Sequence, residues 1–345
     1  MATIEFWIGV DGGGTGTRLR LQRANGERLA QAAGGPSGLM HGIDKAWAVV
    51  ESCIDMAFAQ AGVARPAATQ IAIGLGLAGV HNRQWAQAFI DHDANSGQPY
   101  GLLALETDAL TTLLGAHGGQ PGAIVALGTG SVGEALLADG SRREVSGWGF
   151  PVGDEASGAW LGLRAVQCLQ QALDGRAIAT PFSAALLNQC GGSRDALFVW
   201  LAQANQTRYA QLAPLVIEFA ANDAAAQQIM REAALEVAKM ANALDPAASL
   251  PLALCGGLAQ AIQPHLPASL LARLTPPQDD AVGGALHLVR LQLAQQTKQT
   301  QQAQVAPSQP GGPQAPLQSG QNVNQNASQN HLQGAQDTRN IAHAG

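Results

Sequence analysis

The stretch IGVDGGGTGT, at residues 8–17, decides how this chain is interpreted. The apolar run Ile4–Val10 is typical of a buried strand, and it ends at Asp11 and three consecutive glycines. Glycines have no Cβ, so the backbone amides of such a loop can approach an anion closely. The sequence therefore predicts a phosphate-binding turn after the first strand. The residues expected to form this turn are Gly12, Gly13, Gly14 and Thr15.

The segment after this turn excludes two common nucleotide-binding motifs. A dinucleotide fingerprint requires a helix after the glycines, but Thr17–Gln22 alternates with period two and Ala24–Gly26 is a hairpin signal. A P-loop requires Gly-Lys-Ser/Thr, which the chain lacks. We expect a phosphate-binding β-hairpin in which Asp11 places a hydrated Mg²⁺. An ordinary glycine-rich hairpin, with Asp11 as a turn residue, is the alternative.

The rest of the chain predicts an α/β fold in two similar halves. After a third strand at Arg28–Ala32, the first half continues with a helix at Ile43–Ala61, a strand at Gln70–Leu77, a helix at Asn82–Asp93, a strand at Leu102–Glu106 and a helix at Thr107–Ala116. The second half restarts with strands at Gly122–Leu127, Val132–Ala138 and Arg143–Ser146, then helices between Ala156 and Asp245, a strand at Leu250–Cys255 and a helix at Asp280–Gln295. This order favours a duplicated α/β domain pair with a cleft between the two domains.

The domain boundaries follow from this order and from a change in composition. We expect an N-terminal domain over residues 1–117 and a C-terminal domain over 118–291, with the closing helix at about 280–291 free to pack back on the first. Residues 292–345 are rich in Gln, Asn and Pro and contain no aromatic residue. Such a segment cannot bury enough apolar surface to fold, so we expect a disordered tail.

Composition excludes several classes of protein. The 345 residues carry a net charge of −6 and no basic run, which argues against nucleic-acid binding. No stretch of about 18 apolar residues predicts a membrane span, and the first ten residues lack signal-peptide features. The four cysteines are widely spaced without a CxxC motif, as expected for a cytoplasmic protein without a metal framework.

Two further glycine turns follow later strands. The strand Ala123–Leu127 ends in Gly128-Thr129-Gly130-Ser131, which again precedes a strand, so the same device occurs twice. Two such turns facing each other would clamp a nucleotide, although two unrelated tight hairpins are the alternative. The strand Leu250–Leu254 ends in Cys255-Gly256-Gly257-Leu258, which suits an adenosine-contacting loop or a bare strand-to-helix turn.

Two acidic positions could carry chemistry. Asp108 follows a strand and begins a helix, where it could accept a proton from a substrate or simply favour the helix dipole, and its position leaves both interpretations open. The turn-rich segment Gly147–Gly158 contains Trp148, Asp154 and Glu155 ahead of a helix. This segment could bind a sugar through a carboxylate, backbone groups and the plane of an aromatic ring. Alternatively, its acidic residues could serve only to cap the helix.

Taken together, these motifs resemble the BadF/BadG/BcrA/BcrD-type ATPases. The motifs are Ile8–Thr15, Gly128–Ser131, Gly147–Gly149 with Gly153–Glu155, and Cys255–Gly257. Within that family the set is most similar to the N-acetylglucosamine kinase and bacterial glucosamine kinase branch, over about residues 4–290. The resemblance implies the actin/hexokinase/Hsp70 superfold, with two RNase-H-like domains flanking a cleft for ATP and sugar.

The resemblance also implies an activity and roles for the residues that match. The activity is transfer of the γ-phosphoryl group of ATP to the 6-hydroxyl of glucosamine or N-acetylglucosamine by a homodimer. Asp108 would be the catalytic base and would contact the sugar, and Asp11 would place Mg²⁺. The phosphates would bind at the first turn and at Thr129, Gly130 and Ser131, adenosine at Gly256 and Gly257, and the sugar also at Gly147, Trp148, Gly149 and Asp154.

Two departures and three alternatives limit this interpretation. Gly38 stands where animal N-acetylglucosamine kinases carry a sugar-binding Asn, and Asn222-Asp223 replaces a Gly-Asp expected near the adenosine. One alternative is a kinase for another amino sugar such as N-acetylmuramic acid. The others are a non-catalytic sugar or ATP sensor and a BadF-type ATPase activator, whose iron–sulfur cluster needs clustered cysteines that this sequence does not show.

Overall fold

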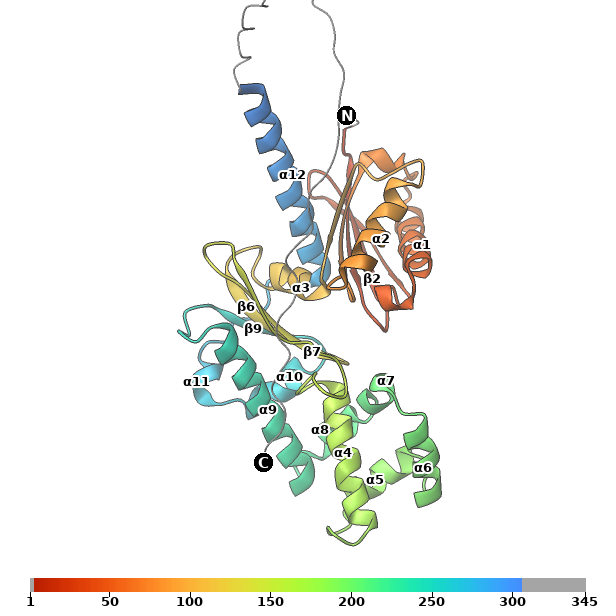
Figure 1. The fold of residues 1–345 in the computed structure, drawn as a ribbon, viewed down its shortest axis with the longest axis vertical. Coiled ribbons are helices and arrows are strands. Elements are labelled where there is room, and N and C mark those ends of the chain that lie inside the picture. The colour runs from red at the N-terminus through yellow and green to blue at the C-terminus, as the bar shows by residue number, and fades with distance from the viewer. Residues whose placement is uncertain (1–2, 306–345) are drawn as a thin grey trace, which may run out of the picture. The chain divides into compact units, whose positions relative to one another are not determined.

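A computed structural model describes residues 3–305 and contains two β-sheets flanked by helices (Figure 1). The strand order is β3-β2-β1-β4-β5 in the first sheet and β8-β7-β6-β9 in the second. The first sheet comprises β1 (Phe6–Gly12), β2 (Thr17–Arg23), β3 (Arg28–Gly34), β4 (Ile71–Leu77) and β5 (Leu102–Glu106). The second comprises β6 (Gly122–Leu127), β7 (Ser131–Leu136), β8 (Arg142–Ser146) and β9 (Leu252–Cys255). The mixed α/β class with two sheets is confirmed.

Three strands of the first sheet end at the same edge. The strands β1, β2 and β3 form an antiparallel meander, whereas β4 and β5 run parallel to β1. The register pairs Gly12 with Leu77 and Gly76 with Glu106, so β1, β4 and β5 end together. Loops at the carboxyl ends of parallel strands are where α/β sheets bind ligands. This edge therefore carries the first glycine turn and the residues that come after β5.

Helices cover the first sheet with apolar side chains at helical spacing. The long α1 (Ile43–Ala61) lies on β2 and β3 and buries Val50, Ile54 and Phe58 against them. The helix α2 (Arg83–Ala94) contacts α1 and β5, and Phe89 stacks on Trp47 with ring centroids 4.3 Å apart. Asn82 caps α2 by accepting hydrogen bonds from two backbone amides.

The second sheet begins with the same arrangement of strands as the first. The strands β6, β7 and β8 form an antiparallel meander, and β9 joins the sheet parallel to β6. The long helix α9 (Ala224–Leu244) crosses β6, β7 and β8. The second glycine turn thus joins β6 to β7 as the first joins β1 to β2.

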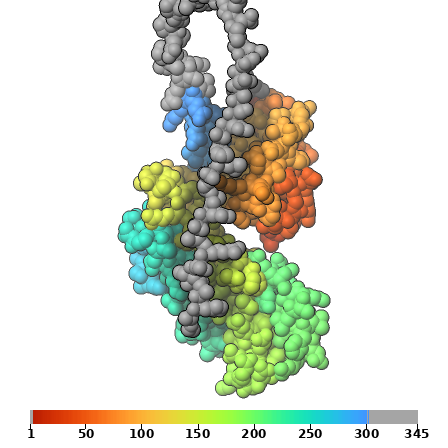
Figure 2. Space-filling view, in the orientation of Figure 1, coloured from red at the N-terminus to blue at the C-terminus, as the bar shows by residue number. Residues whose placement is uncertain are grey.

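A group of helices comes after β8 and lies beside the second sheet, drawn in green in Figures 1 and 2. Its members are α4 (Gly158–Leu173), α5 (Pro181–Gln189), α6 (Arg194–Ala202), α7 (Gln206–Ala210) and α8 (Ala213–Phe219). The shorter elements are α10 (Ala259–Ile262), α11 (Ala268–Leu271), and the 3₁₀ turns η1 (Leu39–His41), η2 (Ala68–Gln70) and η3 (Gln263–His265). Within the described chain, no helix is both long and apolar enough to cross a membrane.

Glycines allow two helices to pack closely against each other and against the sheets. The helix α3 (Asp108–Ala116) contacts β4, β6 and β7, and α12 (Ala281–Val305) lies on the first sheet. A Cβ on Gly74 of β4 would lie 2.1 Å from the carbonyl oxygen of Ala285, and one on Gly284 would lie 1.7 Å from the carbonyl oxygen of Thr111. Both approaches are too close for any side chain, so glycine is what allows this packing.

An ion-pair cluster links the two sheets near the start of α3. Arg142 of β8 reaches Glu106 at the end of β5, with Nη1 and Oε2 3.2 Å apart. The same guanidinium donates two hydrogen bonds to Glu134 of β7, whose side chain is 1% exposed. Burial raises the pKa of the Glu134 carboxyl, and Arg142 opposes this rise. Breaking such a pair leaves a buried charge without its partner, which is strongly destabilising.

The expected elements all occur, with one boundary corrected. The helix α12 continues to Val305, so residues 292–305 of the expected disordered tail are helical. Gln and Ala are good helix formers, and composition alone overlooked this. Residues 306–345 lie outside the described chain. The division into domains at residues 117 and 291 stays a prediction.

The substitution Gly74→Ala should destabilise the protein. Its new methyl group would meet the backbone of α12, and overpacking a core typically costs about 1–3 kcal/mol. Urea denaturation measures the free energy of unfolding. The control is Gly35→Ala, whose Cβ would meet no atom within 4 Å, and a change for Gly74→Ala no larger than that of the control would show that α12 does not lie against β4.

Candidate active site

The first glycine turn is held by the loops that come after β3 and β4. The amide of Gly13 donates to the carbonyl of Gly16 at 2.9 Å, which closes the turn. The amide of Gly38 donates to the carbonyl of Gly13 at 3.0 Å, and that of Ala78 donates to Gly12 at 2.9 Å. Gly38, one of the two departures from the family pattern, is therefore part of the support of this turn. The turn is therefore a fixed backbone surface that is closed by its own hydrogen bond and supported by two neighbouring loops.

Asp11 lies opposite Arg18 across the β1–β2 hairpin. The two residues are register partners, and Nη2 of Arg18 lies 2.6 Å from Oδ2 of Asp11. The Nε atom of Arg18 also donates to Oδ2, at 3.2 Å, so both hydrogen bonds use one carboxylate oxygen. The Asp11 side chain is 21% exposed. Its second oxygen, Oδ1, is used by neither of these bonds.

Asp108 begins α3 at the edge where β1, β4 and β5 end. The hydroxyl of Thr107 caps the helix by accepting from the amide of Leu110, and Oδ1 of Asp108 accepts from the amide of Ala109 at 3.1 Å. Burial raises the pKa of the Asp108 carboxyl, and the negative charge of Asp11 raises it further. A carboxylate with a raised pKa is a stronger base than an exposed aspartate, which suits a general base.

The second glycine turn rests on the N-terminus of α4. The amide of Gly158 donates to Gly128 at 2.8 Å, and the amide of Ala159 donates to Thr129 at 3.2 Å. The hydroxyl of Ser131 donates to the carbonyl of Glu155 at 2.7 Å. The turn therefore depends on the Gly147–Gly158 segment for its shape.

Asp154 ties this segment to the second turn. Its carboxylate is buried and accepts a hydrogen bond from Nε2 of Gln206 at 2.7 Å. Burial raises the pKa of Asp154, and hydrogen bonds from the backbone of Ser131, Gly149 and Phe150 oppose the rise. The structure thus shows a supporting role for Asp154, and its expected contact with sugar stays a prediction. It does not cap α4, because Ser157 does.

The segment around Trp148 is strained and exposes its aromatic ring. Three of the four non-glycine residues with positive φ among residues 3–305 lie here: Ser146 at 62°, Asp154 at 60° and Ala156 at 65°. Backbone strain of this kind concentrates at functional sites, where surrounding structure maintains it. The Trp148 side chain is 85% exposed, which is unusual for so large an apolar residue.

The third glycine turn, at Cys255–Leu258, contacts the end of β6. The amide of Leu258 donates to the carbonyl of Leu127 at 3.1 Å. Gly256 has φ +88°, and a Cβ there would lie 2.3 Å from that carbonyl oxygen, so glycine is needed at this position. Asp223, in the other departure from the family pattern, caps α9 by accepting from Ala225 and Ala226. No described contact connects Asp223 with the third turn.

The expected site residues fall into two groups. The turn after β1 and Asp108 form one at the edge of the first sheet, and the second and third turns with the Gly147–Asp154 segment form the other at the second sheet. The helix α3, which begins at Asp108, contacts strands of both sheets, and Arg142 pairs with Glu106. The expectation that the two glycine turns face each other and clamp a nucleotide stays a prediction.

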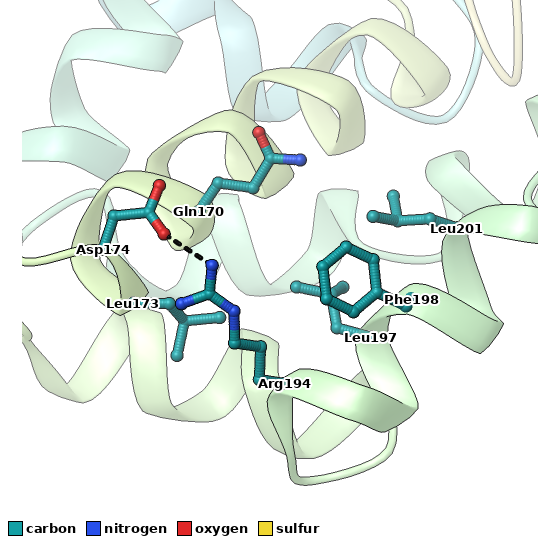
Figure 3. Close-up of a pocket in the computed structure, with 7 residues that line it drawn as sticks. All are labelled: Gln170, Leu173, Asp174, Arg194, Leu197, Phe198 and Leu201. Carbon is teal, nitrogen blue, oxygen red and sulfur yellow. Dashed lines mark hydrogen bonds and ion pairs between the residues drawn. The ribbon is translucent and has the colours of Figure 1, made fainter.

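A separate pocket lies between α4 and α6, away from both groups. Figure 3 shows it lined by Leu173, Leu197, Phe198 and Leu201, with the pair Asp174–Arg194 at its rim. None of the expected site residues lines this pocket.

A hydrated magnesium ion fits the donor set of the first group. Mg²⁺ in kinases takes one or two carboxylates, with phosphate oxygens and water completing the octahedron. Asp11 offers one carboxylate with Oδ1 unused by Arg18, beside the glycine turn. In the described part of the chain, no three His, Cys, Asp or Glu side chains are placed to hold a metal alone. Asp11 therefore suits an ion that arrives with the nucleotide.

Sequence reasoning missed Arg18, Gln206 and Arg142. Arg18 could have been found by counting register through the β1–β2 hairpin, because the turn fixes which residues face each other. Gln206 lies 52 residues from Asp154, and Arg142 lies 36 residues from Glu106. No local pattern marks such pairs.

Comparison with known proteins gives one family and several relatives. The model of the BadF/BadG/BcrA/BcrD ATPase family matches residues 8–264. The glucosamine kinase GspK of Vibrio cholerae is 32% identical over 284 residues, which is 82% of this chain and 95% of that protein. An N-acetylmuramic acid/N-acetylglucosamine kinase of Clostridium acetobutylicum is 24% identical, over 68% of this chain and 77% of that protein.

A solved structure is more similar still. The crystal structure of a candidate N-acetylglucosamine kinase from Chromobacterium violaceum is 52% identical, with a TM-score of 0.80. The match covers 84% of this chain and 100% of that one.

The substitution Asp108→Asn should stabilise the protein at neutral pH. The folded protein raises the pKa of this carboxyl, so its ionised form lowers stability above the folded pKa. That cost is absent below the unfolded value of about 4. We expect Tm to increase at neutral pH, by about 2–4 °C per kcal/mol, and the gain to vanish as the pH falls toward the unfolded value.

Differential scanning fluorimetry across this pH range measures the effect. The exposed Asp91→Asn is the control, since it removes a carboxylate in water. If D108N and wild type melt together at neutral pH, the raised pKa of Asp108 is wrong.

Proposed function

Because this chain belongs to the BadF/BadG/BcrA/BcrD ATPase family, we propose that it is an ATP-dependent hexosamine kinase. It transfers the γ-phosphoryl group of ATP to the 6-hydroxyl of glucosamine or N-acetylglucosamine. The relatives named glucosamine kinase and N-acetylglucosamine kinase support this substrate class. An amino sugar and ATP are thus the small-molecule partners.

The observation that carries this proposal is the environment of Asp108. The sugar hydroxyl must lose a proton as its oxygen attacks phosphorus, and a positioned carboxylate accepts it. Asp108 is fixed at the start of a helix beside the first glycine turn, with burial raising its pKa. Its carboxylate is held at a fixed position, and its raised pKa makes it a stronger base than an exposed aspartate.

The glycine turns supply binding for the phosphates. Phosphoryl transfer needs mainly positioning and neutralisation of charge. The turn after β1 and the turn after β6 both present backbone held by neighbouring loops. We assign the phosphates to these two turns and adenosine to Gly256 and Gly257. Magnesium, held by Asp11, would supply positive charge near the transferred group.

The Gly147–Asp154 segment suits the sugar. The exposed ring of Trp148 provides an apolar plane for a pyranose face, and it lies between Gly147 and Gly149, which both have positive φ. Asp154 holds the segment against the second turn. Asp108 contacts the reacting hydroxyl from the other sheet.

We also propose a cytoplasmic homodimer. The four cysteines are unpaired, as expected in a reducing compartment. On α6, Phe198 and Val199 are 61% and 60% exposed, and a second copy would cover such apolar surface.

A coupled assay of ADP release tests the proposed activity. The panel is glucosamine, N-acetylglucosamine, N-acetylmannosamine, N-acetylmuramic acid and glucose, and we expect the highest kcat/KM with one of the first two. Asp108→Asn should lower kcat by at least about 100-fold while the Kd for ATP stays unchanged. Asp91→Asn should behave as wild type. Absence of turnover with every sugar would reject the kinase.

The substitution Trp148→Ala should weaken sugar binding selectively. Loss of an aromatic contact would raise KM for the sugar by about tenfold, with KM for ATP and Tm unchanged because the ring is exposed. Steady-state kinetics with each substrate varied gives both values. The control is Val152→Ala, which is 89% exposed on the same segment. A sugar KM equal to that of the control would remove Trp148 from the sugar site.

A further inference from the structure

Arg18 is a half-exposed cation beside the first glycine turn. Its side chain is 57% exposed although its guanidinium contacts Asp11 at 2.6 Å. A second contact, from Nη1 to Oδ2 of Asp280, is longer, at 3.7 Å. The guanidinium has five N–H donors, and both of its hydrogen bonds to Asp11 go to one oxygen. Donors remain for another acceptor.

The other arginines of this sheet edge are committed elsewhere. Arg20 is buried and donates to both Asp279 and Asp280, with distances of 2.9 and 3.0 Å. Arg28 is exposed, and its partner is Asp279 at 3.5 Å. Among residues 3–305, Arg18 is the one cation in an ion pair with Asp11. Arg18 is therefore a cation at this edge with donors that an anion at the first turn can engage.

The pair between Arg18 and Asp11 is suited to exchange partners. An exposed ion pair contributes little, because water solvates both charges and the side chains lose freedom. A phosphate group offers a guanidinium two oxygens with more charge than one carboxylate oxygen. Asp11 in turn has a better use, since the proposed function requires its carboxylate for magnesium. Both groups would gain from separation when a nucleotide arrives.

We propose that Arg18 is a ligand of the nucleotide phosphates that occupies Asp11 until the nucleotide binds. On binding, the guanidinium turns from Oδ2 of Asp11 to an oxygen of the terminal phosphates, and the Asp11 carboxylate is released toward magnesium. This inference rests on the proposed use of ATP.

Isothermal titration of the full chain with ATP, ADP and AMP, with and without Mg²⁺, tests this role. We expect Arg18→Met to weaken binding of ATP and ADP by about 10- to 100-fold and that of AMP much less, because AMP lacks the terminal phosphates. Arg28→Met is the matched control, since it removes an exposed arginine from the same sheet. It should bind ATP as wild type does. Arg18→Lys should bind with intermediate affinity, because it keeps the charge without the fork.

A double-mutant comparison separates direct contact from support of Asp11. If Arg18 contacts phosphate, R18M weakens ATP binding in an Asp11→Asn background and without Mg²⁺. If the effect requires both Asp11 and Mg²⁺, Arg18 only positions Asp11 and the proposal is overturned. Unchanged ATP affinity for R18M at unchanged Tm also overturns it. Wild-type protein that binds ATP but phosphorylates no sugar would reject the proposed function and leave this test valid.

Discussion

Direct backbone contact between α3, α12 and β4 is the constraint on which the rest of the structure depends. Gly74 and Gly284 allow approaches that no Cβ would permit, so the helices lie against the sheet and against each other without side chains between them. Close packing of this kind leaves the helices little room to shift. Since α3 begins at Asp108, the same contacts place the proposed base at the edge that carries the first turn.

The charges of the site are arranged by burial and pairing. Burial and the charge of Asp11 raise the pKa of Asp108, and Asp11 itself forms an ion pair with the half-exposed Arg18. The chain carries a net charge of −6 and yet has to bind a polyanion. Backbone amides at the glycine turns, one arginine and a magnesium ion that arrives with the nucleotide can meet this requirement without a basic surface.

The second sheet begins with the same strand-turn-strand unit as the first, but its glycine turn has different supports. Its glycine turn is supported by the N-terminus of α4 and by Asp154, a residue that the family resemblance associates with sugar. Trp148 lies in the strained segment from Ser146 to Ala156 and is exposed. One segment therefore both supports the second glycine turn, which we propose binds phosphate, and presents the exposed ring of Trp148, which we propose binds the sugar.

The sequence by itself determined the two strand-turn-strand units, the order of elements and Asp108 as a candidate base. These depend on local spacing: glycines after an apolar run, alternation with period two, and a carboxylate at a helix start. Only the tertiary structure decided that Arg18 pairs with Asp11, that Gln206 and three backbone groups hold Asp154, and that Arg142 pairs with Glu106. Pairs such as Gln206 with Asp154 join residues far apart in the chain, and their energies depend on burial, which no local pattern records. The continuation of α12 from the expected end at Gln295 to Val305 was also missed, because a polar segment can extend a helix whose first turns are anchored in a core.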